Sequence, residues 1–322
     1  MWWGTGFALA AGLMWGLVFV APLMLPGYPA ALQSVGRYLA FGLICLPLAW
    51  LDRHTLRRFA TADWWEALKL AAVGNLLYYL LLAASIQRTG GPLTTMVIGT
   101  LPVVIAITSN LRDAHRDGRL PWRRLAPSLA LIATGIGLVN RVEWAAMVAG
   151  GGLDKGAYLV GAAMAVGAAA CWTWYPLRNA DWLRHHPDRS PRAWATAQGV
   201  ATLPLAMLGF GAFWVFMWAT DHPFAMPSGP TPWRFWGLMV AVGLFASWLG
   251  TLCWNEASQR LPTSLVGQMI VFETLAALAY AYVWRGAWPP AGTLLGVACL
   301  VAGVLWAVRI KPVPVAAEPS PH

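Results

Sequence analysis

The sequence predicts an all-α membrane protein whose ten transmembrane helices form two inverted five-helix repeats. Three observations support this prediction. Of the 322 residues, 58% are hydrophobic and 11% are charged, against about 45–50% and about 25% in ordinary soluble domains. Apolar stretches long enough to cross a bilayer recur ten times. Short motifs in the first half of the chain also return in the second half.

The apolar stretches have roughly the 17 to 25 residues that a helix needs to cross the hydrocarbon core. The first stretch lacks the basic region and cleavage site of a signal peptide, so we expect it to remain as a span. The predicted spans are 4–25, 30–51, 64–86, 92–111, 125–142, 157–178, 193–218, 234–256, 262–284 and 290–309.

The formal net charge of +9 comes from basic residues that gather in alternate connections. If the N-terminus is cytoplasmic, the arginine-rich connections at 52–63, 112–124 and 179–192 all face the cytoplasm, and Lys311 follows on the same side. This is the positive-inside pattern. We therefore expect a multi-pass protein with both termini in the cytoplasm, and we do not expect nucleic acid as a partner.

Two segments that close apolar stretches resemble one another. Ala84 to Arg88 reads Ala-Ser-Ile-Gln-Arg and is soon followed by Pro92, while Ala257 to Arg260 reads Ala-Ser-Gln-Arg and is followed by Pro262. Because each repeat has an odd number of helices, the second copy must enter the membrane from the opposite side, as in many secondary transporters. The predicted domains are the repeats at 1–142 and 157–311 and a flexible cytoplasmic tail at 312–322.

One carboxylate, Glu273, lies near the centre of an apolar stretch. A rise of 1.5 Å per residue from Pro262 places it about 16 Å into the membrane, near the midplane where transporters hold their sites. Desolvation there disfavours the ionised form unless a cation is near, which suits a group that couples transport to protons. An uninterrupted helix would place Tyr280 on the same face. The alternative is a structural glutamate that only fixes helix packing.

Arg37 lies about two turns inside the second predicted span. A buried cation is costly unless it is paired or its side chain reaches the interface. Arg37 therefore either faces a cavity, where it binds a substrate carboxylate or balances Glu273, or extends to the membrane surface.

Polar side chains in the third and fourth spans are further candidates for substrate contacts. Asn75 and Tyr79 are four residues apart and share a helix face, and Tyr78 lies one turn from Asn75. Thr95 follows in the next span. These groups could hydrogen-bond a ligand, or they could join helices to one another within the bilayer.

Trp15 and Trp172 lie deeper than the interfacial tryptophans and occupy corresponding positions in the two halves. Together they could form the aromatic wall of a small-ligand pocket, although packing alone would also explain them. The four cysteines lie inside predicted spans without metal-ligand or redox spacing. We expect no metal and no cofactor.

These features together resemble the drug/metabolite transporter superfamily, EamA type, over nearly the whole chain. The similar residues include Trp15, Arg37, Gly99-Thr-Leu-Pro-Val-Val104 and Phe272-Glu-Thr-Leu275. The resemblance implies an efflux permease of the bacterial inner membrane, which exports amino acids or related small metabolites through a central cavity between the repeats. Thr274 stands where the family has proline after glutamate, which puts a helix break there in doubt.

Two other classes of function stay open. A membrane-embedded lipid-modifying enzyme would need a nucleophile, a metal cluster or an acid–base pair at one interface, and the sequence offers none with suitable spacing. A non-transporting scaffold would not require a duplicated core with polar residues at mid-depth. We therefore expect a transporter rather than an enzyme, with a small-molecule substrate and the lipid bilayer as partners. The spacing of Gly292 and Gly296 permits another helix to approach closely. We expect that helix to belong to the same chain, and the alternative is a homodimer.

Reporter fusions test the predicted topology. A cytoplasmic reporter fused after His115 should be active, because the arginine-rich connection at 112–124 resists translocation. A periplasmic reporter that is active at the same position would contradict both the orientation and the inverted repeat.

Overall fold

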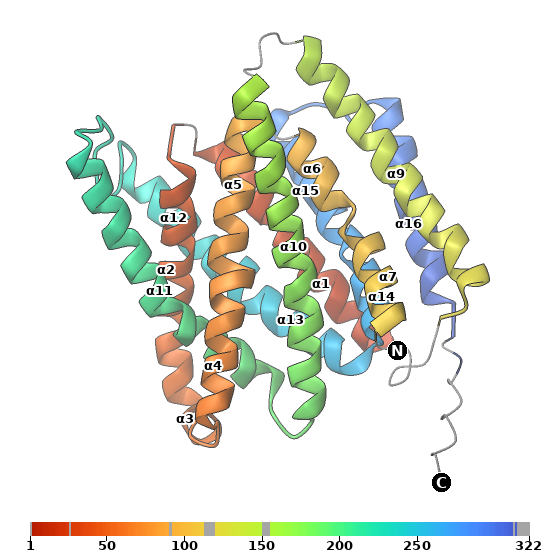
Figure 1. Ribbon diagram of the computed structural model, residues 1–322, viewed down its shortest axis with the longest axis horizontal. Helices are drawn as coiled ribbons and strands as arrows, with labels where there is room; N and C mark the ends of the chain where they lie inside the picture. Colours follow the sequence, from red (N-terminus) through yellow and green to blue (C-terminus); the bar gives the residue numbers. More distant parts are fainter. Residues whose placement is uncertain are drawn as a thin grey trace.

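The computed structural model describes residues 2–25, 27–89, 92–112, 120–149, 155–311 and 313, and these residues are mostly helical (Figure 1). The all-α prediction is therefore confirmed. The predicted tail at 312–322 lies outside the described residues, apart from Val313. Seven described helices are long and apolar enough to cross a membrane, and two shorter apolar ones, Val97–Arg112 and Ala291–Ala307, accompany them. The seven are Trp2–Met24, Ala30–Leu51, Thr61–Thr89, Gly156–His185, Pro191–Ala219, Pro232–Arg260 and Leu265–Trp284.

The helices follow the predicted spans closely, although several are subdivided. The first half contains α1 (Trp2–Met24), α2 (Ala30–Leu51), α3 (Arg53–Leu56), α4 (Thr61–Leu70), η1 (Ala71–Leu77), α5 (Tyr78–Thr89), α6 (Pro92–Gly99), α7 (Leu101–Arg112) and α9 (Trp122–Ala149). The second half contains α10 (Lys155–His185), α11 (Pro191–Ala219), α12 (Pro232–Val242), η2 (Gly243–Leu249), α13 (Gly250–Arg260), α14 (Thr263–Met269), α15 (Val271–Arg285) and α16 (Ala291–Val308).

Two wide helical turns occur at matched places in the two halves. The continuous helices Thr61–Thr89 and Pro232–Arg260 each have 29 residues. Each contains a π-helical segment of seven residues near its middle, η1 in the first and η2 in the second. Such segments often mark functional sites, because an extra residue in the turn redirects the side chains.

A second matched pair of irregularities is a short interruption between two helical pieces. Thr100 separates α6 from α7, and Ile270 separates α14 from α15. Pro102 explains the first interruption, since proline has no N–H to donate to the preceding turn. The second occurs without a proline, and it lies three residues before Glu273. The helix assignment is therefore interrupted close to Thr274, where the absence of the family's proline had left a helix break in doubt.

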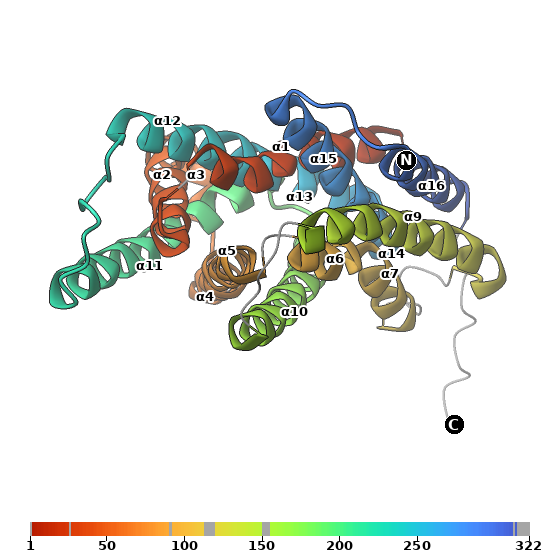
Figure 2. The same ribbon diagram turned by 90° about the horizontal axis from the view of Figure 1, so that it is seen from above.

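The helices form a flattened bundle, and several connections between them lie at the same end. The start of α1, the junction from α2 to α4 and the connection from α10 to α11 lie at the lower end in Figure 1. From above, α9 and α16 pack on each other at one edge of the molecule (Figure 2). A Cβ atom added to Gly296 would lie 2.8 Å from the carbonyl oxygen of Gly135. The small-residue spacing of α16 therefore serves packing within the chain.

Helix α1 packs closely on α15 through two glycines spaced four residues apart. A Cβ atom at Gly12 would lie 3.0 Å from the backbone nitrogen of Glu273, and one at Gly16 would lie 2.8 Å from that of Ala277. Small residues at such a contact let helix backbones approach within the membrane. This contact fixes the depth and rotation of the helix that carries Glu273.

Replacing Gly16 with leucine should lower the thermal unfolding midpoint of the purified protein in detergent. Overpacking of a tight contact costs about 1–3 kcal/mol, which exceeds the gain of up to about 1 kcal/mol from removing a helical glycine. Gly6→Leu in the same helix is the matched control, because a Cβ atom there meets nothing within 4 Å. Equal midpoints for the two variants would show that the α1–α15 contact is not close.

Candidate functional site

A narrow buried cavity lies between the two halves, close to the wide turns η1 and η2. It has about 340 Å³ of space between its atoms, most of it too narrow for anything larger than water. Its lining combines two opposite charges, aromatic rings and small polar groups. The lining residues are Trp15, Val18, Arg37, Tyr38, Asn75, Tyr78, Trp172, Ala246, Ser247, Thr251 and Glu273.

Arg37 is buried within the protein, with 5% of its surface exposed. Its Nε donates a hydrogen bond of 3.0 Å to Oγ of Ser247. Its guanidinium carbon lies 4.9 Å from the ring centroids of both Tyr38 and Tyr79, and such cation–π contacts strengthen when water is excluded. These contacts hold the guanidinium at the cavity, which favours the cavity interpretation over extension to the membrane surface.

Glu273 lies in the first turn of α15 and is also buried, with 4% exposed. Ile270 keeps right-handed helical backbone angles, and the backbone N–H of Glu273 donates to the carbonyl oxygen of Ile270 at 2.9 Å. The described residues of α15 offer Glu273 no ionic partner on its own helix.

Arg37 and Glu273 line the same cavity without forming an ion pair. Within the described part of the chain, no Arg37 nitrogen lies within 4.0 Å of a Glu273 oxygen. One atom of each side chain, Nη1 of Arg37 and Oε2 of Glu273, is buried without a hydrogen-bond partner among the described residues. The site therefore offers a cationic donor and a carboxylate acceptor at separate points.

Aromatic rings form the remaining wall. Trp15 packs edge-on against Trp172, with ring centroids 5.2 Å apart, and Tyr78 stacks on Trp172 at 4.6 Å. The indole Nε1 of Trp172 and the hydroxyl of Tyr78 have no hydrogen-bond partner among the described residues. A tryptophan from each half of the chain thus meets the other at the cavity, and Trp172 and Tyr78 leave polar atoms available to a ligand.

The structure brings six of the nine sequence-predicted site residues to this cavity: Trp15, Arg37, Asn75, Tyr78, Trp172 and Glu273. Tyr79 lies behind Arg37 and donates a hydrogen bond of 3.4 Å to the carbonyl of Val18. The side chain of Thr95 is outside the described part of the structure.

Tyr280 lies apart from the residues that line this cavity. Its hydroxyl donates to the carbonyl oxygen of Leu13 at 3.0 Å, and the residue does not line the cavity. Its hydrogen bond to Leu13 therefore joins α15 to α1.

Sequence reasoning missed Tyr38, Ser247 and Thr251, the other residues with hydroxyl groups in the lining. Asn75 and Ser247 are each the fifth residue of their wide turn, η1 and η2. An alignment of the two helices on these segments could have revealed Ser247. Serine and threonine are otherwise too common in membrane helices to be noticed singly.

A buried hydrogen-bond network lies next to the cavity wall at Trp172 and supports it. The hydroxyl of Tyr175 donates to Gln198 at 2.8 Å, and Gln198 in turn donates to Asn179 at 3.1 Å. Asn179 also donates to Asn255 at 2.8 Å. Because the ring of Tyr175 stacks on Trp172 with centroids 5.0 Å apart, this network fixes the rotation of the tryptophan. Buried polar networks whose members are satisfied make a core rigid.

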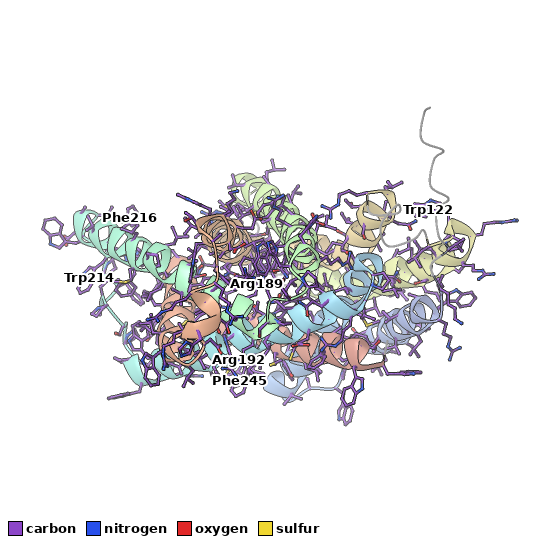
Figure 3. The ribbon with its side chains drawn as sticks, turned by 90° about the horizontal axis from the view of Figure 1, so that it is seen from below. Trp122, Arg189, Arg192, Trp214, Phe216 and Phe245 are labelled. Atoms are coloured by element: carbon purple, nitrogen blue, oxygen red, sulfur yellow. The ribbon has the colours of Figure 1, made fainter. Side chains whose placement is uncertain are left out.

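Ion pairs join the two halves at the lower end of the molecule. Their second-half members all come from residues 178–192, which include the end of α10, the connection to α11 and the start of α11. From below, the labelled Arg189 and Arg192 lie around this connection, whereas Trp214 and Phe216 lie at the outer end of α11 (Figure 3). The pairs are Arg178 with Glu66 at 2.5 Å, Arg112 with Asp181 at 3.0 Å, Arg192 with Asp52 at 2.5 Å, and His186 with Asp63 at 3.7 Å.

Three comparisons place these features among known proteins. A model of the EamA-like transporter family matches residues 2–113. Inner membrane protein YtfF of Escherichia coli (strain K12) is 52% identical to this chain over 314 residues, which cover 96% of each protein.

A solved crystal structure also superposes on the chain with a TM-score of 0.70, covering 94% of this chain and 96% of the other at 18% identity. At this identity the likeness indicates a shared fold and says nothing about substrate.

Proposed function

Because the chain belongs to the EamA-like transporter family, we propose that it exports amino acids or related small metabolites across the inner membrane, coupled to protons. Family membership itself points to a membrane transporter rather than an enzyme. The observation that carries the finer proposal is the cavity in which Arg37 and Glu273 stay unpaired.

The proposed architecture is ten spans in two inverted repeats at 1–142 and 157–311. The matched wide turns η1 and η2 support it, as do the matched interruptions at Thr100 and Ile270. Transporters built on inverted repeats commonly bind substrate between the repeats at broken helices. Both termini are then cytoplasmic, which agrees with the start of α1 lying at the same end of the bundle as the connection from α10 to α11.

The charges of the cavity suit a small zwitterion. The free donor of Arg37 can bind a carboxylate, and Glu273 can bind an ammonium group. The faces of Trp15, Trp172 and Tyr78 can contact the ammonium through cation–π attraction or an apolar side chain through packing. Binding both ends of one substrate would satisfy two buried groups that otherwise have no partner.

Glu273 is the proposed coupling group. A buried carboxylate is costly in its ionised form unless a positive charge is near. A proton or an ammonium group can satisfy it, and the two compete for the same oxygens. Protonation of Glu273 would therefore release the substrate, and substrate binding would release the proton.

In this proposal, the ion pairs of residues 178–192 keep the cavity closed on the lower side. Each pair joins one half to the other, so the cytoplasmic end can open only if they separate. Exposed pairs contribute roughly 0–1 kcal/mol each, which is weak enough for a reversible opening. The narrow cavity then corresponds to a closed stage of alternating access.

Replacing Glu273 with glutamine should abolish the response of transport to a pH gradient. Glutamine mimics the protonated carboxyl, so the fold should persist while proton exchange is lost. Flux of a panel of radiolabelled amino acids would be measured in liposomes with and without an imposed gradient, at matched protein levels.

Glu256→Gln is the matched control, because Glu256 pairs with Arg260 on the same helix and does not line the cavity. It should respond to the gradient as the unaltered protein does. If Glu273→Gln also kept the full response, Glu273 would be a structural residue rather than the coupling group.

A further inference from the structure

A membrane-facing groove lies on the opposite side of Asn75 from the cavity. Its walls are α2, the η1–α5 segment and α11, all parts of apolar helices long enough to span a membrane. It has about 930 Å³ of unfilled space, against about 340 Å³ for the cavity. The lining residues are Ala31, Ser34, Val35, Ala72, Leu76, Leu77, Leu80, Leu205, Gly209 and Phe213.

The chemistry and position of the groove indicate what can enter it. Nine of its ten residues are apolar or glycine. Because its walls belong to membrane spans, the surrounding medium at this depth is hydrocarbon, and the chains of lipids reach it first. Leaving such a groove unfilled would lose van der Waals contacts along its whole length.

The length of the groove matches one leaflet. Its wall runs from Leu80 to Ala72 on one helix and from Phe213 to Leu205 on another. Eight residues at 1.5 Å each give about 12 Å, close to half of a hydrocarbon core about 30 Å thick. The groove therefore fits a single acyl chain that enters from one side of the bilayer.

Ser34 has the one hydroxyl among the lining residues, and it lies at the end of the groove where the ester group of the lipid would be. Ser34 is the fifth residue of α2, about 6 Å from the start of the helix. It is 1% exposed, and its Oγ has no hydrogen-bond partner among the described residues. A buried hydroxyl without a partner is costly, and the ester carbonyl of a phospholipid near the membrane interface would accept its proton once the side chains that cover Ser34 move aside.

We propose that this groove is a binding site for one acyl chain of a phospholipid from the leaflet at which α2 begins. The chain lies between first-half helices and α11 of the second half. Gly209 forms the floor, since a Cβ atom there would lie 3.0 Å from Cγ1 of Val35. The hydrogen bond of 3.2 Å from Asn75 to Thr202 separates the chain from the cavity.

The test is photocrosslinking in liposomes made with a phosphatidylethanolamine that carries a diazirine on one acyl chain. Labelled peptides would be mapped by mass spectrometry. We expect label to concentrate on groove residues such as Leu76 and Leu205, several-fold above the level at Leu208, which is 72% exposed outside the groove. Label that follows exposure over the whole lipid-facing surface would show ordinary surrounding lipid and overturn the proposal.

Two variants that fill the groove make the test specific. Gly209→Phe and Ala31→Phe each place a ring in the space from a different wall, so both should reduce label in the groove to the level of the surrounding lipid. Leu208→Phe is the matched control and should leave the label unchanged. The thermal unfolding midpoint of each filling variant would be compared with that of the unaltered protein. If a variant with an unchanged midpoint kept the full label in the groove, the proposed site would be contradicted. The readout does not depend on transport, so its failure would leave the proposed function untouched.

Discussion

The separation of two buried opposite charges is the constraint on which the rest of the structure depends. Arg37 and Glu273 line one cavity at membrane depth, where an ionised side chain without a partner is costly. Direct contact would be the simplest way to lower that cost. Instead, Ser247 and two tyrosine rings hold Arg37, and the close packing of α1 on α15 fixes the backbone at Glu273. Each charge is held in place by the protein, and each keeps an atom for a ligand.

The irregular parts of the helices serve this arrangement. The wide turns η1 and η2 carry Asn75 and Ser247, which line the cavity. The close contact of α1 with α15 then fixes the depth of Glu273, since Gly12 leaves no room between the backbones. Regular helices would bury the same side chains, but they would aim them differently.

Much of the site could be predicted from the sequence, because charged and aromatic residues are conspicuous in apolar stretches. Arg37, Glu273, Trp15 and Trp172 were found on that basis, and all four line the cavity. What the sequence could not provide was the local geometry of the helices. A projection along the helix placed Tyr280 on the same face as Glu273, but it could not show that the hydroxyl of Tyr280 donates to the carbonyl oxygen of Leu13 on α1. Ser247 was missed because it lies in the wide turn η2, and no residue pattern in the sequence predicts such a turn.

The most direct test of this account asks whether the two charges receive opposite ends of one substrate. In a liposome counterflow assay, an amino acid from the panel that the protein transports would compete against three compounds: its unlabelled form, the matching amine without the carboxylate, and the matching carboxylic acid without the amine. The account predicts strong competition by the amino acid alone, because each analogue leaves either Arg37 or Glu273 without a partner. Equal competition by the amine or the acid would contradict it, since one of the two charges would then have no part in binding.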